Sequence, residues 1–348
     1  MSCNRYRGKR VGIDAYGWLY KGAYSCAVEL GLGTIDSYPS SSYDPNAPTE
    51  PYIAHCLARL ELLLENGITP IFVFDGAPLP AKKATNLQRM KSRALHRERG
   101  RELHAKGDTS KSFGAFCQAL SVTSAMARKF FVTLAVLHPK IECIIAPYEA
   151  DAQLAFLSKE RLIDIVMSED SDCIPYGCRK VLFKFNGDGF GEEFRRRYIG
   201  ANEGLTFIGW SDEMFIQYCV LVGCDYCLSL KGIGPVTAHE LVSRCKTPEK
   251  ISTTIFDPTT KRARILNPLR QSASIFAIFK GTLDFLGNLD APQTTIANIA
   301  NGTLDPKTLE PYPPPIIHKR KRPSNDKINK NAKKTHTHDS NQNGQLTH

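Results

Sequence analysis

The stretch IDIVMSEDSDCIPYG, residues 163–177, places a charged segment directly after an apolar one. The run from Ile163 to Met167 is typical of a strand that is buried on both faces of a sheet. It ends in Ser168-Glu169-Asp170-Ser171-Asp172, where three carboxylates occupy four positions. Carboxylates so close together repel one another and resist burial unless a cation neutralises them. The negative charge at the end of this strand therefore predicts a functional role for these carboxylates.

Four further runs have the same strand-like character, and helical patterns separate them. They are RVGID (10–14), TPIFVFD (69–75), IECIIA (141–146) and KVLFKF (180–185). The pattern PYIAHCLARLELLLENG repeats apolar residues at helical spacing and stops at Gly67, and EADAQLAFLSKERL indicates a second helix. Strands that alternate with helices predict an α/β fold with a mostly parallel central sheet flanked by helices.

Composition divides the rest of the chain. Residues 36–51 are rich in Pro, Ser and Asp and predict a flexible loop, whereas residues 80–135 predict a long helical insert without a strand signal. Residues 212–245 predict two helices around a glycine turn. The expected boundaries are 1–210 for the α/β core, 211–310 for a helical region and 311–348 for a disordered basic tail.

Charge is unevenly distributed along the 348 residues, whose formal net charge is +10. Residues 82–111 carry a net charge of +7 and residues 318–348 carry +6, so the remainder is mildly acidic. Two separate basic segments favour a polyanionic partner over a merely solvated surface. The sequence has no apolar run of 18 residues for a membrane span, and its polar start resembles no secretory signal. Eleven cysteines without such a signal indicate reduced thiols in an intracellular protein.

Acidic residues recur where the predicted strands end. In an open α/β sheet the carboxyl ends of the strands border the ligand crevice, so these side chains can converge. Asp170 and Asp172 would project to one side of an extended segment, and Glu149 can join Asp151 if it lies at the start of the following helix. Glu169 is out of phase with its neighbours and is expected to face solvent. The converging set is Asp14, Asp75, Glu149, Asp151, Asp170, Asp172 and Asp225.

The chemistry of this set points to metal ions. Its ligands are oxygen atoms only, with no His or Cys among them, which selects Mg²⁺ or Mn²⁺ over Zn²⁺. Six or seven acids exceed what one Mg²⁺ needs and suit a pair of ions roughly 3.5–4 Å apart, as in two-metal phosphoryl transfer. A single acid such as Asp14 or Asp75 would more often be a helix cap or a turn residue, so the prediction rests on the whole set.

Five motifs that carry these acids resemble those of the flap-endonuclease (XPG-type) family of structure-specific 5′ nucleases. They are VGIDAYGWLYKGA, IFVFDGAPLPAKK, APYEADAQLA, SEDSDCIPYG and LVGCDYCLSLKGIG, in order and at family spacing over about residues 5–310. The most similar branch is that of eukaryotic exonuclease one. The resemblance implies a PIN-like 5′-nuclease fold, with N and I regions in residues 1–210. It also implies that the seven acids match the carboxylates with which the family binds two Mg²⁺ ions, with Mn²⁺ as a substitute. It implies 5′→3′ exonuclease action on double-stranded DNA with 5′-flap endonuclease activity.

The basic insert has a part in this resemblance. Lys82, Lys83, Arg89, Arg93 and Arg97 recur at helical spacing and form a basic face that would neutralise DNA phosphates. In the family this segment is a helical arch over the active site, where Lys82 and Arg89 match the pair that contacts the scissile phosphate. The alternative is an exposed basic helix without a ligand.

Residues just after Asp14 match positions that handle DNA in the family. Tyr16 matches the tyrosine that stacks on a base near the scissile site, with plain packing as the alternative. Tyr20 stands where the closest branch carries a wedge-like His, and an aromatic ring there suits stacking into a DNA junction. Lys21, beside it, is a further expected DNA-binding residue.

The sequence SLKGIGPVTAHELV, residues 229–242, predicts a second DNA contact. Gly232 and Gly234 would let the backbone approach a ligand closely, and Pro235 suits the first turn of a helix whose free N–H groups can hold a phosphate. Next to GCDY it resembles the family's helix–two-turn–helix, which grips the duplex and binds K⁺. Ser229 and Ile233 are expected at that K⁺ site.

One departure from the family affects the expected activity. Members begin with Met-Gly and a short apolar helix, whereas MSCNRYRGKRVGID reaches the first strand after about nine residues. We expect metal binding to survive this difference, and the rate and DNA positioning to suffer. The alternative functions are therefore a flap-specific endonuclease of the same family and a catalytically weak DNA-junction-binding protein, followed by a small-molecule phosphatase.

The resemblance also implies partners and a location. The expected ligand is double-stranded DNA with 5′ ends, nicks or flaps, and the expected protein partners are mismatch-repair proteins or a sliding clamp. We expect a monomer that acts in DNA repair and recombination without membrane contact. The tail motifs HKRKRP and KINKNAKK predict a nuclear localisation signal, with a solvated basic tail as the alternative.

Overall fold

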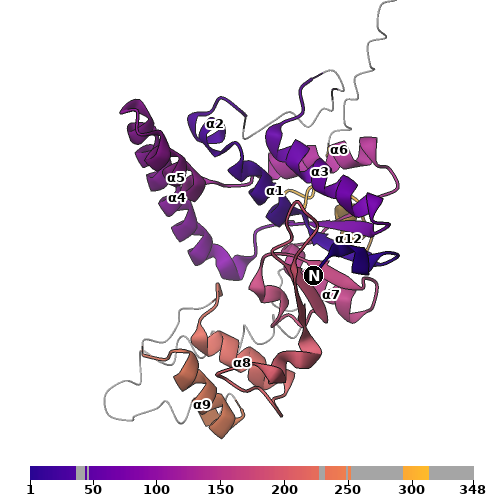
Figure 1. The fold of residues 1–348 in the computed structure, drawn as a ribbon, viewed down its shortest axis with the longest axis vertical. Coiled ribbons are helices and arrows are strands. Elements are labelled where there is room, and N and C mark those ends of the chain that lie inside the picture. Colours follow the sequence, from indigo (N-terminus) through magenta and orange to yellow (C-terminus); the bar gives the residue numbers. More distant parts are fainter. Residues whose placement is uncertain (37–43, 45–46, 227–231, 248–249, 252–292, 313–348) are drawn as a thin grey trace, which may run out of the picture.

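A six-stranded sheet forms the centre of the computed structural model, which describes residues 1–36, 44, 47–226, 232–247, 250–251 and 293–312 (Figure 1). The strand order is β3-β2-β1-β4-β5-β6, and every neighbouring pair is parallel except β5 and β6. The strands are β1 (Arg10–Asp14), β2 (Thr69–Phe74), β3 (Glu142–Ile145), β4 (Ile165–Met167), β5 (Lys180–Phe183) and β6 (Glu192–Arg195). The predicted α/β class with a mostly parallel sheet is confirmed.

Strand β6 is absent from the sequence-based prediction. Its sequence, Glu-Glu-Phe-Arg, is mostly charged, and the strand lies at the edge of the sheet, antiparallel to β5. An antiparallel edge strand can keep one face in water, so it lacks the continuous apolar run that marks a central parallel strand. The five strands that were predicted carry that run.

Two helical layers cover the sheet. On one face, α1 (Ala15–Tyr24), α3 (Pro51–Glu65) and α6 (Ser124–Leu137) pack against a core that includes Ile13 and Phe72. The Phe72 ring makes edge-on contacts with Trp18 of α1 and Phe130 of α6, each at 5.4 Å between centroids. On the other face, α7 (Ala150–Lys159) and α8 (Asp212–Val222) share a core with Val73. Because both faces are covered, the central strands had to be apolar throughout.

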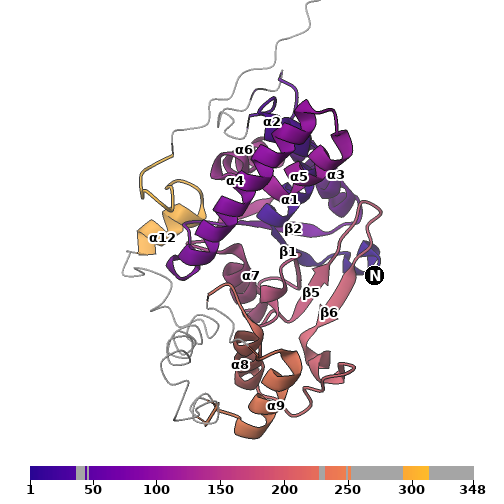
Figure 2. The ribbon, with the colours of Figure 1, turned by 90° about the vertical axis from the view of Figure 1, so that its left-hand side faces the viewer.

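The helical insert predicted at 80–135 divides into two parts. After a short 3₁₀ turn (Pro80–Lys82), α4 (Lys83–Ala105) and α5 (Thr109–Ala119) pair with each other and project from the body (Figures 1 and 2). Phe116 anchors the pair between Gly31 of α2 (Ala27–Leu32) and Gly100 of α4, where a Cβ would lie 2.1 and 2.7 Å from its ring. Helix α6 instead returns to the core layer, so the projecting arch ends at α5.

The two helices predicted in residues 212–245 are present as α8 and α9 (Pro235–Cys245), and they form the lower lobe in Figure 2. A small core around Ala238 and Val242 joins them. Helix α12 (Gln293–Ala300) and the residues after it leave this lobe, because Ile299 and Leu304 join the core of the main sheet. The helical region predicted at 211–310 is thus not one spatial unit.

Several expectations fall largely outside the described residues. They concern the loop at 36–51, of which residues 37–43 and 45–46 are not described, Ser229, and the tail from residue 313 onward. Among the described helices, none alone is long and apolar enough to cross a bilayer, although α5 and α6, bent by 82° at their junction, satisfy that criterion as a pair.

Candidate metal and nucleic-acid site

The carboxyl ends of β1, β2, β3 and β4 open into a groove beneath α4. Its volume is about 780 Å³. Five of the predicted acids line it, together with basic residues of α4. These acids are Asp14, Asp75, Glu149, Asp151 and Asp170. Because the strands are parallel, residues that are far apart in sequence meet at this one edge.

Local hydrogen bonds orient the acids of β1 and β2. Asp14 caps α1, and its Oδ1 accepts a hydrogen bond of 3.0 Å from the amide of Gly17. The hydroxyl of Ser168, at the end of β4, donates to Asp14 Oδ2 at 3.3 Å. Asp75 Oδ1 accepts from the amide of Ala150 at 2.7 Å, which ties the end of β2 to the first residue of α7. Strand ends and helix starts together hold these carboxylates in place.

Glu149 lies at the start of α7 in an extended conformation, as the sequence required if Glu149 and Asp151 are to converge. Asp151 is buried within the first turn and accepts a hydrogen bond of 3.3 Å from the thiol of Cys173. Two tyrosines that the sequence analysis overlooked reach Glu149 Oε2, namely Tyr226 at 3.0 Å and Tyr176 at 3.5 Å. Both follow an acidic motif directly, at SEDSDCIPY and GCDY, and this adjacency is the signal that was available.

The segment after β4 is a turn, so the expectation of an extended strand with Asp170 and Asp172 side by side is wrong. Asp170 caps a 3₁₀ turn (Ser171–Cys173), and its Oδ1 accepts from the amide of Asp172 at 2.8 Å. Asp170 consequently faces the groove beside Asp14, whereas Asp172 faces Lys82. Glu169, expected to face solvent, is more than one third exposed and pairs with Lys21 at the rim.

Lys82 occupies the centre of the acidic cluster. Only 6% of its surface is exposed, and its Nζ lies 2.8 Å from Glu149, 3.5 Å from Asp225 and 3.9 Å from Asp172. The ammonium group also lies 4.8 Å from the ring centroid of Tyr226. Burial alone would lower the pKa of Lys82, but the three carboxylates raise it above its ordinary value. The lysine therefore stays charged and acts as an internal counter-ion.

The remaining acids are not neutralised in this way. Burial, together with the charge of Asp170, raises the pKa of Asp14 to about 6. Burial and the charges of Asp14 and Glu149 raise the pKa of Asp75 to about 7. Burial and the nearby acids also raise the pKa of Asp151 well above its ordinary value. Carboxylates whose charge is disfavoured by desolvation and by one another are those that a cation would bind.

The donor set suits a hard divalent cation. All of the predicted ligands are carboxylates, and among the described residues no ion pair joins Asp14, Asp75 or Asp151 to a basic side chain, whereas Lys82 pairs with Glu149, Asp172 and Asp225. In the part of the chain that the structure describes, no three His, Cys, Asp or Glu side chains are grouped closely enough to hold one ion. Several of these carboxylates instead turn to backbone amides, as Asp75 does, or to Lys82, as Glu149 does. Small side-chain rotations, and release of Lys82, would be needed to assemble the ligands.

The predicted DNA-binding residues of α4 differ in their surroundings. The guanidinium of Arg89 donates to both carboxylate oxygens of Asp225, at 2.8 and 2.9 Å. Arg93 donates to the hydroxyl of Tyr20 at 2.8 Å, so this tyrosine is tied to the arch. Lys83 is exposed, and Arg97 is half-buried.

Three predicted sites lie elsewhere on the groove or in the lower lobe. Tyr16 lines the groove beside Asp75, where burial raises the pKa of its hydroxyl. Gly232 has a φ of +87°, which favours glycine, and Gly234 caps α9 just before Pro235. Among the described residues, no atom lies within 4 Å of a Cβ built at either glycine. Ile233 packs against the small core of the lower lobe.

Comparison with known proteins finds two family models that match two separate segments of the chain. The model of the XPG N-terminal domain matches residues 1–96, and that of the XPG I-region matches residues 140–225. Exonuclease 1 of Arabidopsis thaliana is 33% identical over 323 residues, which cover 87% of this chain and 42% of that protein. Exonuclease 1 of Danio rerio is 36% identical over 249 residues, 72% of this chain and 29% of that protein. The chain belongs to the XPG family of nucleases.

This XPG-family chain spans less than half the length of those relatives. Its fold is similar to that of the catalytic core of Rad2 in complex with DNA substrate, with a TM-score of 0.52 and 22% identity over 80% of this chain and 81% of that one. Asp14 and Asp75 fall within the N-terminal match, and the other five acids fall within the I-region match. The arch from residue 97 onward and the segment that returns at 293–312 lie outside both family models.

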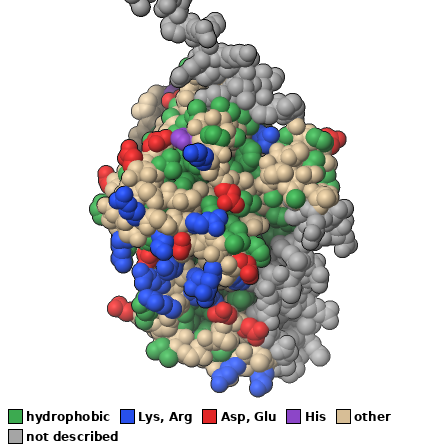
Figure 3. Space-filling model, turned by 90° about the vertical axis from the view of Figure 1, so that its right-hand side faces the viewer, with side chains coloured by type: hydrophobic (Ala, Val, Ile, Leu, Met, Phe, Trp, Pro, Cys, Tyr) green, Lys and Arg blue, Asp and Glu red, His purple; other side chains and the backbone are tan. Residues whose placement is uncertain are grey.

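Charge on the surface of this XPG-family chain is not confined to the arch. The face turned away from α4 also carries Lys and Arg side chains, interspersed with Asp and Glu (Figure 3). At the amino-terminal ends of the strands, Lys9 pairs with Asp164 and Arg10 with Glu142, and all four side chains are exposed. Paired surface charges attract a polyanion weakly, so the groove and the arch remain the best candidates for DNA.

Proposed function

We propose that this chain is a Mg²⁺-dependent 5′ nuclease, a 5′→3′ exonuclease on double-stranded DNA that also cuts 5′ flaps. The observation that carries the proposal is the convergence of five acids at the ends of four parallel strands, beside a basic helix. Buried carboxylates with raised pKa values supply a place for cations, and the helix supplies a place for phosphates. The XPG family and the two Exonuclease 1 relatives support this reading.

The seven acids would hold two Mg²⁺ ions, with Mn²⁺ as a substitute. When bound, such ions lower the pKa of a water molecule and neutralise charge that develops on the scissile phosphate. The half-buried side chains of Asp14, Asp75 and Asp151 and the exposed side chain of Asp170 provide one part of the ligand set in the groove. Glu149, Asp172 and Asp225 complete it once Lys82 releases them.

Lys82 and Arg89 then have a second task in the proposed mechanism. Both now form ion pairs with Asp225, so they would lose that partner if Asp225 held a metal ion, and two positive groups would become available beside the groove. The freed groups would stabilise negative charge on the phosphate that is cut. Tyr16 would present its ring to a base beside that phosphate.

The duplex would extend from the groove along α4 and to the lower lobe. Lys83, Arg93, Arg97 and Lys21 would contact its phosphates, with Tyr20 at the junction. The turn at Gly232 and Gly234 would hold a phosphate farther from the cut, beside a K⁺ site that includes Ile233 and Ser229. Mismatch-repair proteins or a sliding clamp as partners, a monomeric state and a nuclear location complete the proposal.

A cleavage assay tests the proposal. A fluorescently labelled duplex with a recessed 5′ end, incubated with protein and Mg²⁺, should be shortened from that end, and a 5′-flap duplex should be cut at its junction. Asp170→Ala should abolish both reactions, whereas Asp188→Ala, in an exposed turn outside the groove, should leave both intact. Cutting that survives Asp170→Ala would refute the two-metal site.

The same assay separates the alternatives. Cleavage of the flap without resection of the recessed duplex would establish a flap-specific endonuclease. Tight binding of the junction with no cleavage in Mg²⁺ or Mn²⁺ would establish a DNA-junction-binding protein. A band-shift measurement on the same substrates supplies the binding half of this comparison.

A further inference from the structure

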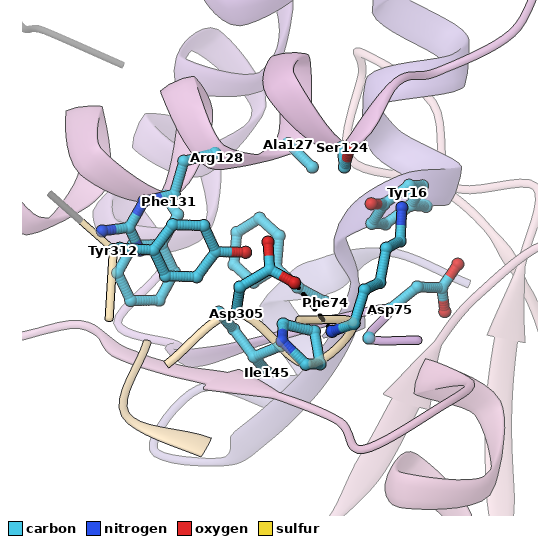
Figure 4. A pocket seen from close by; sticks show the side chains of 13 residues that line it. Tyr16, Phe74, Asp75, Ser124, Ala127, Arg128, Phe131, Ile145, Asp305 and Tyr312 are labelled. Carbon is cyan, nitrogen blue, oxygen red and sulfur yellow. Dashed lines mark hydrogen bonds between the residues drawn. The ribbon is translucent and has the colours of Figure 1, made fainter. Parts of the chain in front are cut away.

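The segment that follows α12 returns to the active-site groove. Figure 4 shows Asp305 and Tyr312 of this segment facing Arg128 and Phe131 of α6, in a small pocket that also includes Tyr16 and Asp75. Lys307 lines this pocket and the large groove as well. A lysine far along the chain is thus placed at the acidic site, outside both family matches.

The backbone around Lys307 is held in position. Asp305 Oδ1 accepts hydrogen bonds from the amides of Lys307 at 2.7 Å and Thr308 at 3.2 Å, and the amide of Leu309 donates to the Asp305 carbonyl at 2.8 Å. An isolated bridge between Leu304 and Pro311 closes the base of this turn. The turn is therefore a defined platform for the side chain at its tip.

Contacts with α6 fix this platform to the core. Arg128 donates to the carbonyl of Gly302 at 3.1 Å, and its guanidinium lies 4.1 Å from the ring centroid of Tyr312 and 5.1 Å from that of Phe131. A Cβ at Gly302 would lie 2.7 Å from the Phe131 ring, so the chain passes α6 as closely as glycine allows. The position of Lys307 relative to the groove consequently follows from close packing.

The charges around the groove distinguish Lys307 from the other cations that line it. Lys21 is paired with Glu169, Lys82 with three acids, and Arg89 with Asp225. Arg93 is hydrogen-bonded to the Tyr20 hydroxyl. Within the described residues, the Lys307 ammonium has no hydrogen bond or ion pair, although its side chain borders six carboxylate-bearing residues of the same groove. It is the basic side chain that is available to a phosphate without first breaking a contact.

We propose that Lys307 binds a backbone phosphate of the DNA strand in the groove, next to Tyr16. This inference rests on the proposed function, because it assigns one more contact to the same site. The strand would then contact both the arch and the returning segment, which line the same groove. Lys307 is a positioning residue, since its charge would act on the strand rather than on the reacting atoms.

Salt dependence of DNA binding tests this assignment. Each phosphate contact contributes a slope of about 0.9 to the dependence of log affinity on log salt, or about 3.5-fold between 50 and 200 mM. Binding of the recessed duplex is measured in EDTA, so that no strand is cut, for wild type, Lys307→Gln and Lys307→Arg. Lys140→Gln, an exposed lysine before β3 at the opposite end of the sheet, is the matched control.

We expect Lys307→Gln to bind more weakly and to lose about 0.9 of the wild-type slope, whereas Lys307→Arg and Lys140→Gln keep it. With Mg²⁺, Lys307→Gln should raise KM more than it lowers kcat. A Lys307→Gln slope and KM equal to those of Lys140→Gln would overturn the inference while leaving the nuclease activity in place. Wild-type protein that neither binds nor cuts the duplex would overturn the proposed function and this inference together.

Discussion

Replacing Asp75 by Asn should stabilise the metal-free protein while abolishing its activity. Asp75 is half-buried at the groove, and desolvation together with the charges of Asp14 and Glu149 raises its pKa to about 7. Against an ordinary value of 3.8, keeping this group charged costs about 4 kcal/mol at pH 8. The amide oxygen of Asn can still accept the hydrogen bond from Ala150, so the substitution removes charge and little else.

The effect has a defined pH dependence. Because the pKa is higher in the folded state, the folded protein holds a proton that the unfolded chain has lost above pH 4. The free energy of unfolding of the wild type therefore falls between about pH 4 and pH 7, whereas Asp75→Asn has no proton to lose there. We expect the free energy of unfolding of Asp75→Asn to exceed that of the wild type by about 4 kcal/mol at pH 8 and by about 1.6 kcal/mol at pH 5.

Urea unfolding in EDTA at these two pH values measures the difference, with Asp188→Asn as an exposed control that should change little. Adding Mg²⁺ at pH 8 should stabilise the wild type by mass action and stabilise Asp75→Asn less. An Asp75→Asn protein that is less stable than the wild type at pH 8 would refute the reasoning. A stability difference that does not vary with pH would refute it equally.

Two further substitutions test the packing and the charges of the site. Lys82→Met should destabilise the metal-free protein by about 3 kcal/mol at pH 8, because Glu149, Asp172 and Asp225 lose their shared cation. Thermal unfolding measures the loss, with the exposed Lys140→Met as the control. Gly76→Ala should lower the free energy of unfolding by about 3 kcal/mol, because the new Cβ would lie 1.9 Å from the carbonyl oxygen of Ala146. Gly114→Ala, in α5 with nothing within 4 Å, should instead be neutral or slightly stabilising, and equal effects of the two glycine substitutions would contradict the packing argument.

Sequence patterns were most informative for strands that are covered on both faces of the sheet. Strands β1, β2 and β4 were predictable because both of their faces are covered, which demands continuous apolar runs, and β3 and β5 carry shorter apolar runs. The acids that follow them were predictable as a group, because parallel strands bring their carboxyl ends to one edge. Strand β6 escaped notice because an edge strand tolerates charges such as Glu192 and Arg195.

Side-chain partners were decided by the tertiary structure. The sequence indicated that Lys82 is basic and follows Asp75, but not that it is buried among Glu149, Asp172 and Asp225. Likewise, an alternation of Asp170 and Asp172 fits an extended strand and a capped turn equally well, and the hydrogen bond to the Asp172 amide selects the turn. Such choices depend on atoms that come from distant parts of the chain.

The sequence by itself determined the α/β class, the family and the chemistry of the acidic set, because apolar periodicity and carboxylate clustering are local properties of the chain. Only the tertiary structure decided that the segment after α12 packs on α6 and brings Lys307 to the groove. Its packing rests on Gly302 against Phe131, a contact between residues more than 170 positions apart. No local pattern encodes such a contact, because its free energy exists only when both surfaces are already folded.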